Sequence, residues 1–123
     1  MNPKKILVVD DEVDLVETIR LPLEMEGYTV LVSYNGEDAL NQARKENPNL
    51  IILDIMLPKL DGYKVCRLLK FDEGYKHIPI LMLTAKTQEK DKILGMGTGA
   101  DEYITKPFDI DELVEKVKKY LSK

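Results

Sequence analysis

The chain alternates between short apolar runs and longer stretches of helical pattern, and this alternation leaves few folds open. Five apolar runs are predicted strands: residues 5–9, 28–33, 50–53, 79–83 and 101–105. Five further stretches are predicted helices: residues 13–26, 35–47, 61–70, 89–97 and 109–121. A strand followed by a helix, five times over, indicates an α/β fold with helices on both faces of a parallel sheet.

The same pattern restricts the order of the strands in the sheet. Right-handed crossovers with short connections leave few arrangements for five parallel strands. The expected order is 2-1-3-4-5, the doubly wound, flavodoxin-like arrangement. The 123 residues have the size of one domain, so we expect residues 1–123 to form a single unit.

Polar side chains follow four of the apolar runs at the point where each run ends. In chain order they are Asp10 with Asp11, Asp54, Thr84 and Lys106. In the expected order, strands one, three, four and five are neighbours, about 4.8 Å apart. Ligands of such sheets bind outside the carboxyl ends of the strands, where the strand order reverses. We therefore expect these side chains to form one site.

Asp54 most needs a chemical explanation, because apolar residues lie on both sides of it. An ionised carboxylate in apolar surroundings is costly unless it is paired, hydrogen-bonded or bound to a metal. Asp10, Asp11 and Asp54 would also repel one another, and a Mg²⁺ ion with oxygen ligands removes that problem. Lys106 and the hydroxyl of Thr84 add groups that suit a phosphoryl group. Asp54 is then the candidate nucleophile, forming an aspartyl-phosphate.

Composition excludes several other classes of protein. The net charge of −4 argues against a nucleic-acid binder, and one His and one Cys make a zinc site unlikely to form. The sequence contains no apolar run long enough for a membrane span, and from the pattern of its first residues we expect no signal peptide. The single cysteine, Cys66, cannot form an internal disulfide, which suits a cytoplasmic protein.

Taken together, the motifs resemble those of response-regulator receiver domains of two-component signalling systems, over essentially the whole chain. The matching segments are Asp10-Asp11, "LDIMLPKLDG" around Asp54, "LTA" with Thr84, and "GADEYITKPF" with Lys106. The resemblance implies that Asp54 accepts a phosphoryl group from a sensor histidine kinase. It also implies a switch that catalyses its own phosphorylation and dephosphorylation and signals through its fourth helix, fifth strand and fifth helix.

The resemblance further assigns roles to single residues. Asp11, Asp54 and the backbone carbonyl of Met56 are expected to bind Mg²⁺, with Asp10 helping through water. Thr84 and Lys106 are expected to contact the phosphoryl group. The resemblance also assigns Thr84 and Tyr103 as switch residues, and it implies a cis peptide bond between Lys106 and Pro107.

Each residue taken alone could also have a purely structural role. Asp10 and Asp11 could simply begin a helix, Thr84 could be a strand-end hydroxyl, and Lys106 a solvated loop charge. Among functions, a Mg²⁺-dependent aspartyl-phosphate phosphatase also places Asp after an apolar strand, but the dehalogenase-type enzymes want a second Asp where Met56 stands. A flavodoxin-type carrier would need a phosphate cradle in place of the acidic "DDEVDL".

Two surface features lead to further expectations. In the first helix Leu15, Val16, Ile19 and Leu23 fall on one stripe, which we expect to be buried. Leu21, Pro22 and Met25 fall on a different side, which predicts a kinase-docking face; the alternative is that Pro22 only kinks the helix. Met56 and Lys86 stand two residues beyond Asp54 and Thr84. Neither side chain is suited to align a hydrolytic water, so we expect a long-lived phosphoryl group.

Overall fold

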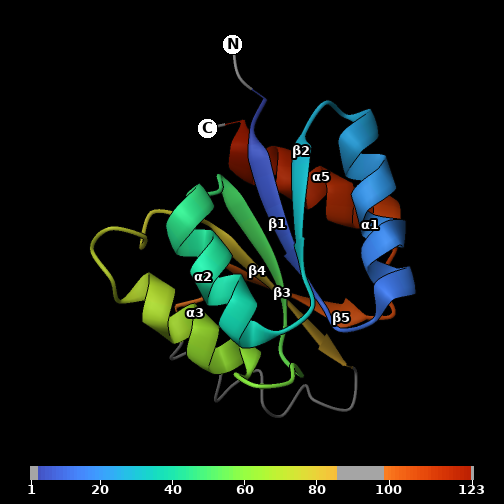
Figure 1. Ribbon diagram of the computed structural model, residues 1–123. Helices are drawn as coiled ribbons and strands as arrows, with labels where there is room; N and C mark the ends of the chain where they lie inside the picture. Colours follow the sequence, from blue (N-terminus) through green and yellow to red (C-terminus); the bar gives the residue numbers. More distant parts are fainter. Residues whose placement is uncertain (1–2, 86–98, 123) are drawn as a thin grey trace.

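The computed structural model describes residues 3–85 and 99–122 (Figure 1). Its elements, in chain order, are β1 (Lys5–Val9), α1 (Val13–Met25), β2 (Thr29–Ser33), α2 (Gly36–Glu46), β3 (Leu50–Asp54), α3 (Gly62–Lys70), β4 (Ile80–Ala85), β5 (Glu102–Lys106) and α5 (Ile110–Leu121). The helix expected at residues 89–97 lies outside the described residues, as does Lys86.

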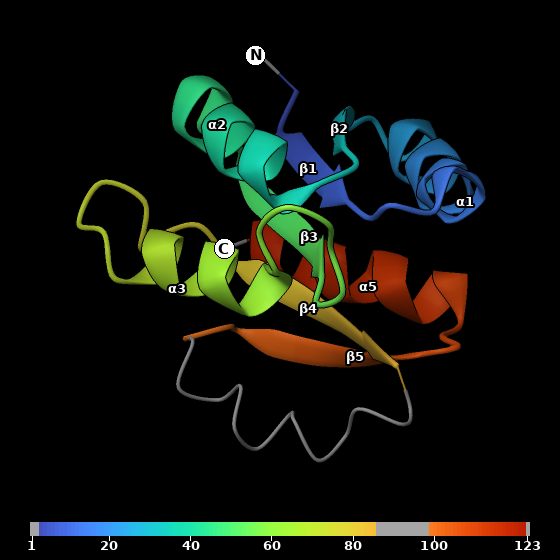
Figure 2. The ribbon, with the colours of Figure 1, turned by 60° about the horizontal axis from the view of Figure 1, so that its bottom comes forward.

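The five strands form one parallel sheet in the order β2-β1-β3-β4-β5, which confirms the expected order. Helices α1 and α5 cover one face of the sheet, and α2 and α3 cover the other (Figures 1 and 2). Strand β1 shows how the sequence builds two cores, because successive side chains point to opposite faces. Ile6 and Val8 pack towards α1 and α5, while Leu7 and Val9 pack towards α2 and α3.

Three strands end later than the sequence pattern predicts, β3 and β5 by one residue and β4 by two. Asp54, Thr84 and Lys106 were expected just beyond their strands, but each lies within one, and β4 continues to Ala85. The reason is that parallel pairing joins backbone groups, which a polar side chain does not interrupt. The pairing of Asp54 with Leu83, and of Thr84 with Thr105, extends the ladder past the apolar runs.

Helix α1 has the expected buried side and the expected exposed apolar side, but Leu15 is less buried than expected. Val16, Ile19 and Leu23 are buried in the core, but Leu15 is only partly buried at its edge. Leu21 and Met25 are 55% and 85% exposed, and the helix runs through Pro22, which is partly buried.

The single cysteine and the single histidine lie in different surroundings. Cys66 is buried beneath α3, and His77 is exposed in the connection between α3 and β4. Within residues 3–85 and 99–122, no helix combines the length and the apolar character that a membrane crossing requires.

Candidate functional site

The carboxyl ends of β1, β3, β4 and β5 bring the expected polar side chains together. Figure 2 looks towards this edge of the sheet, which the connection between β3 and α3 partly encircles. Asp10 follows β1, Asp54 ends β3, Thr84 is the last but one residue of β4, and Lys106 ends β5. Parallel strands place these four positions side by side, because all their carboxyl ends lie at the same edge.

Three carboxylates form the acidic part of the site. One oxygen from each of Asp10, Asp11 and Asp54 lies within 4.8 Å of the others. Asp10 and Asp54 are buried, whereas Asp11 is exposed. Oxygen ligands at this separation, two of them shielded and one facing solvent, suit a hard divalent cation that keeps some of its water.

Lys106 supplies the positive charge on the other side of the site. Its Nζ donates a hydrogen bond to Asp10 Oδ2 at 3.0 Å and lies 3.5 Å from Asp54 Oδ1. Asp10 Oδ1 accepts a hydrogen bond from the backbone N–H of Glu12 at 2.9 Å. Both carboxylate oxygens of the buried Asp10 therefore accept hydrogen bonds, and Asp10 connects Lys106 to the cluster of three carboxylates.

The protonation of Asp54 reflects this crowding. Burial and, next to it, the negative charge of Asp10 together raise the pKa of Asp54 to about 6, against the opposing effects of Lys106 and the Met56 N–H. Burial alone would lower the pKa of Lys106. Its hydrogen bond to Asp10 and its attraction to Asp54 and Glu12 instead raise the pKa of Lys106 above the ordinary value. Asp54 is thus a carboxylate whose charge lacks full compensation from the protein.

The hydroxyl of Thr84 is the second uncompensated group. Thr84 is fully buried, and within the described residues its Oγ1 has no hydrogen-bond partner. Buried hydroxyls are normally hydrogen-bonded, so a buried hydroxyl without a partner at this edge of the sheet indicates that Thr84 can donate a hydrogen bond to a ligand. A phosphoryl oxygen on Asp54 is an acceptor of that kind.

Met56 occupies the connection that leaves β3. Its side chain is exposed, and its backbone N–H points to Asp54 Oδ1 at 3.4 Å. A hollow of about 450 Å³ lies beside it, lined by Asp11, Leu57 and Pro58 among others. The hollow gives solvent and a small donor access to the acidic group from one side.

Two glycines shape this connection, and the sequence pattern did not identify either. A Cβ on Gly36, at the start of α2, would lie 1.7 Å from the carbonyl oxygen of Leu60. A Cβ on Gly62 would lie 2.2 Å from the carbonyl oxygen of Asp54. Hydrogen bonds join the same elements, from Gly36 N–H to the Pro58 carbonyl at 3.3 Å and from Gly62 N–H to the Ile55 carbonyl at 2.9 Å. Only glycine permits these approaches, which fix residues 55–61 over the site. The only signals in the sequence are the glycines themselves, each directly after an Asn or Asp.

The remaining expected residues lie close to this edge or on β5. Tyr103 lies in β5, opposite Met82, and is partly buried against the core beneath α2 and α3. The peptide bond between Lys106 and Pro107 is cis. The bland interpretation of Asp10 and Asp11 as the start of a helix does not hold, because α1 begins at Val13 with Glu12 at its N-cap.

Comparison with known proteins agrees with this geometry. The family model of the response regulator receiver domain matches residues 6–118. The chain is 52% identical over 118 residues to the alkaline phosphatase synthesis transcriptional regulatory protein PhoP of Bacillus subtilis, a match that covers 96% of this chain and 48% of that protein. It is 46% identical to the probable transcriptional regulator ycf27 of Cyanophora paradoxa, with 98% and 49% covered. The chain thus spans about half the length of these curated relatives.

Solved structures show the same fold. A putative response regulator from Chloroflexus aurantiacus is 40% identical, with a TM-score of 0.92 and 99% and 100% of the two chains covered. The receiver domain of the sensor histidine kinase PA1611 from Pseudomonas aeruginosa, described with a magnesium ion in its active-site cleft, is 29% identical, with a TM-score of 0.89 and 99% and 100% covered. From the family match and these relatives, we conclude that the chain belongs to the response regulator receiver domains of two-component systems.

Proposed function

We propose that this receiver domain is a phosphoacceptor switch in which Asp54 takes a phosphoryl group from a sensor histidine kinase. The observation that carries the proposal is the pairing of two uncompensated groups, the buried carboxylate of Asp54 and the orphan hydroxyl of Thr84, at one edge of the sheet. A phosphoryl group on Asp54 would give both of them a partner. Lys106 would then provide a cation for the added negative charge.

The three carboxylates suit Mg²⁺, because this ion prefers oxygen ligands. Carboxylate oxygens of Asp10, Asp11 and Asp54 lie close enough to share one small cation, and two of them are buried. Asp11, Asp54 and the Met56 carbonyl would hold the ion, with Asp10 assisting through water. When bound, Mg²⁺ would neutralise charge on the carboxylates and on the phosphoryl oxygens.

The chain's own residues would perform the rest of the transfer. An oxygen of ionised Asp54 attacks the phosphorus atom of a phosphohistidine, a P–O bond forms, and the P–N bond breaks with its electrons passing to the imidazole. Lys106 and Thr84 bind the non-bridging oxygens, where negative charge is concentrated. In dephosphorylation, water attacks the phosphorus atom of the aspartyl-phosphate. The P–O bond to Asp54 breaks, the carboxylate of Asp54 is the leaving group, and inorganic phosphate is released.

Phosphorylation of Asp54 would alter a surface of the protein through the residues of β4 and β5. Thr84 lies opposite Thr105 in the sheet, and Tyr103 lies two residues earlier in β5. A shift of Thr84 towards the phosphoryl group would therefore reach Tyr103 and the surface of β5 and α5. We propose that this surface, with the fourth helix of the family, carries the signal to an output partner.

The kinase is proposed to dock on the exposed side of α1. Leu21 and Met25 are exposed apolar residues on one helix, with Pro22 between them, and an apolar side of this kind marks an interaction surface. Leu21→Asp should slow transfer from the cognate kinase at least about tenfold and leave transfer from acetyl phosphate unchanged. Equal losses with both donors would contradict docking at this side.

The phosphoacceptor proposal is tested by intact-protein mass spectrometry after incubation with acetyl phosphate and Mg²⁺. We expect one added phosphoryl group, lost in Asp54→Ala and retained in Asp61→Ala, whose carboxylate caps α3 instead. Omission of Mg²⁺ and Asp11→Ala should each prevent the modification. Full modification of Asp54→Ala, or sustained phosphate release over many turnovers, would refute the assignment.

A further inference from the structure

Helix α3 has a second organised side, which faces solvent. Val65, Cys66 and Leu69 point into the core, whereas Lys64, Arg67, Leu68 and Phe71 are all exposed. These four positions are spaced i, i+3, i+4 and i+7, so they form one continuous stripe about 10 Å long. Leu68 is 40% exposed and Phe71 is 71% exposed, which is unusual for large apolar side chains adjacent on one helix.

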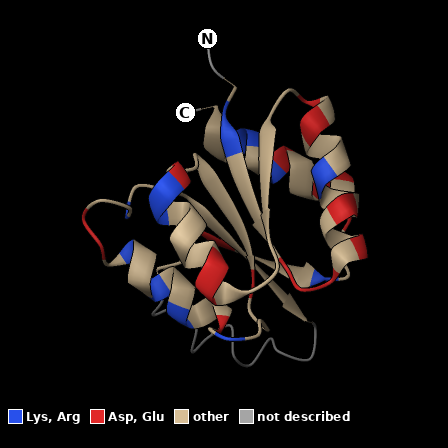
Figure 3. Ribbon diagram, in the orientation of Figure 1, with Lys and Arg blue, Asp and Glu red and all other residues tan. Residues whose placement is uncertain are grey.

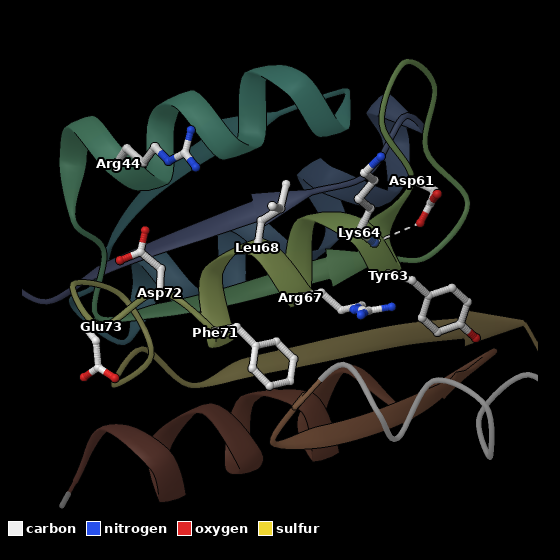
Figure 4. Close-up of a pocket in the computed structure, with 9 residues that line it drawn as sticks. All are labelled: Arg44, Asp61, Tyr63, Lys64, Arg67, Leu68, Phe71, Asp72 and Glu73. Carbon is white, nitrogen blue, oxygen red and sulfur yellow. Dashed lines mark hydrogen bonds between the residues drawn. The ribbon is translucent and has the colours of Figure 1, made fainter.

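The stripe lines a hollow between α2 and α3, which we call the α3 groove. It has a volume of about 1220 Å³, and Arg44 of α2 contributes to its wall (Figure 4). In Figure 4, Lys64 and Leu68 form the flank of the stripe nearer α2, and Arg67 and Phe71 form the flank nearer β4. The groove is on the face of the sheet opposite α1, so it is separate from the kinase-docking side. At one end it shares Asp61 and Tyr63 with the hollow beside Asp11 and Met56, whereas its other lining residues are not part of that hollow.

The cations of the α3 groove are not used within the protein. Among residues 3–85 and 99–122, Arg44, Lys64 and Arg67 form no ion pair. Helix α3 contains no acidic residue at all, and Figure 3 shows blue positions on α3, whereas α1, on the opposite face of the sheet, is mainly red at its charged positions. Three unpaired cations in a protein of net charge −4 require an explanation outside the fold.

The carboxylates of the groove are at its ends and already have partners. Asp61 Oδ1 accepts a hydrogen bond from Lys64 N–H at 2.9 Å, and Asp72 Oδ1 accepts one from Gly74 N–H at 2.9 Å. Glu73 forms an ion pair with Lys76 at 2.8 Å. Figure 4 shows Asp61 beyond one end of the stripe and Asp72 and Glu73 beyond the other. The middle of the groove is therefore both cationic and apolar.

We propose that the α3 groove binds an acidic amphipathic helix of a partner protein. Apolar side chains of that helix would cover Leu68 and Phe71, and its carboxylates would pair with Arg44 and Arg67. A helix bound in a groove is recognised through its own apolar anchors spaced i, i+3, i+4 and i+7, and the exposed Leu68 and Phe71 give such anchors an apolar surface to cover. A nucleic acid fits less well, because the carboxylates at both ends would repel a continuous phosphate backbone.

Charge complementarity also predicts how the interaction depends on conditions. Exposed charges are screened by salt, with a Debye length of about 10 Å at 0.1 M, so affinity should fall as salt is added. Because Arg44, Arg67, Leu68 and Phe71 do not line the hollow beside Asp11, binding should require neither Mg²⁺ nor acetyl phosphate. The proposal therefore stands or fails separately from the phosphoacceptor function.

The test uses the whole chain and a synthetic capped peptide of about 15 residues, long enough for several helical turns. The peptide carries Leu and Phe on one side and Glu at the flanking positions, and binding is followed by amide chemical shifts and by fluorescence anisotropy. We expect shift changes concentrated at Arg44 and residues 64–71. Arg67→Glu should raise the Kd about tenfold or more, and Phe71→Ala about fivefold or more.

Matched controls isolate the groove. Lys45→Glu reverses an exposed charge next to Arg44 but outside the groove, and Met25→Ala removes an exposed apolar side chain on α1. Both should leave the Kd within about twofold of the unaltered protein. Thermal unfolding of each variant checks that the fold is retained, which is expected because all four altered side chains are exposed.

Several results would overturn the proposal. These are the absence of binding at about 1 mM peptide, equal affinity for a peptide with Lys in place of Glu, or shift changes located on α1. Tighter binding of a single-stranded oligonucleotide, abolished by Arg67→Glu, would assign the groove to nucleic acid. Concentration-dependent self-association of the chain, lost in Phe71→Ala, would assign it to a second copy.

Discussion

Replacement of Asp54 by Asn should stabilise the protein at neutral pH when no divalent cation is present. The side chain of Asp54 is buried, with the residue only 4% exposed, and its charge adds to that of Asp10 in the same space. Asn keeps the shape of the side chain and can still accept the hydrogen bond from Met56 N–H. The substitution removes a charge that the fold does not fully compensate.

The size and the pH dependence of this gain follow from the pKa of Asp54. Its value rises from the ordinary 3.8 to about 6 in the folded protein, a difference of about 2. At about 1.4 kcal/mol for each pKa unit, the ionised side chain destabilises the fold by up to about 3 kcal/mol. The cost is absent below about pH 3, where the carboxyl is protonated in both states, is still small near pH 4, grows as pH rises, and is complete above about pH 7. The variant should therefore gain stability only as pH rises through this window.

The assay is urea unfolding in EDTA at a pH near 4 and a pH near 7.5, with the variant and the unaltered protein compared at each. We expect a gain of about 2 to 3 kcal/mol at the higher pH, equivalent to an increase in Tm of the order of 10 °C, and almost none at the lower pH. Asp14→Asn, an exposed carboxylate on α1, should change stability by no more than about 0.5 kcal/mol. Saturating Mg²⁺ should stabilise the unaltered protein more than the variant. Equal gains at both pH values, or a loss at pH 7.5, would refute the reasoning.

Three further predictions concern the metal and the phosphoryl group. Between pH 7 and pH 5 the apparent Mg²⁺ affinity, measured by calorimetry, should fall about tenfold, because protons compete for Asp54 with its pKa of about 6; an unchanged affinity would contradict that competition. Gly36→Ala should displace the connection after β3 and so weaken Mg²⁺ binding several-fold, which corresponds to about 1 kcal/mol. Gly74→Ala should leave Mg²⁺ binding unchanged, because its Cβ would meet only a side-chain oxygen at 3.4 Å. Met56→Asn combined with Lys86→Glu should shorten the lifetime of the phosphoryl group severalfold, about 1 kcal/mol of barrier, in radiolabel decay without kinase; slower decay would show that access of water sets the rate.

The sequence predicted the sheet and the gathering of Asp10, Asp54, Thr84 and Lys106 because both depend on local pattern. Apolar runs with helical stretches between them determine a doubly wound sheet, and polar residues at the ends of the runs must then meet at one edge. The ends of β3, β4 and β5 were wrong by one or two residues, because polarity marks where burial changes and backbone pairing continues beyond it. The ion pair between Lys106 and Asp10 depends on side-chain geometry, which a pattern of residue types does not contain.

The contact between Gly36 and Leu60 shows why the rest of the site could not be predicted. It joins the start of α2 to a connection whose path depends on Lys59 in a left-handed conformation, at φ of 69°. Neither residue type is specific to such an arrangement, and the two positions are distant in the sequence. The contact nevertheless has a clear consequence for function. Carboxylates that repel one another would move apart if the backbone around them were free to relax, so a site of this kind needs close packing that prevents relaxation. Gly36 and Gly62 provide that packing from two sides of residues 55–61, and they allow the buried charge of Asp54 to persist at a cost in stability until a cation and a phosphoryl group compensate it.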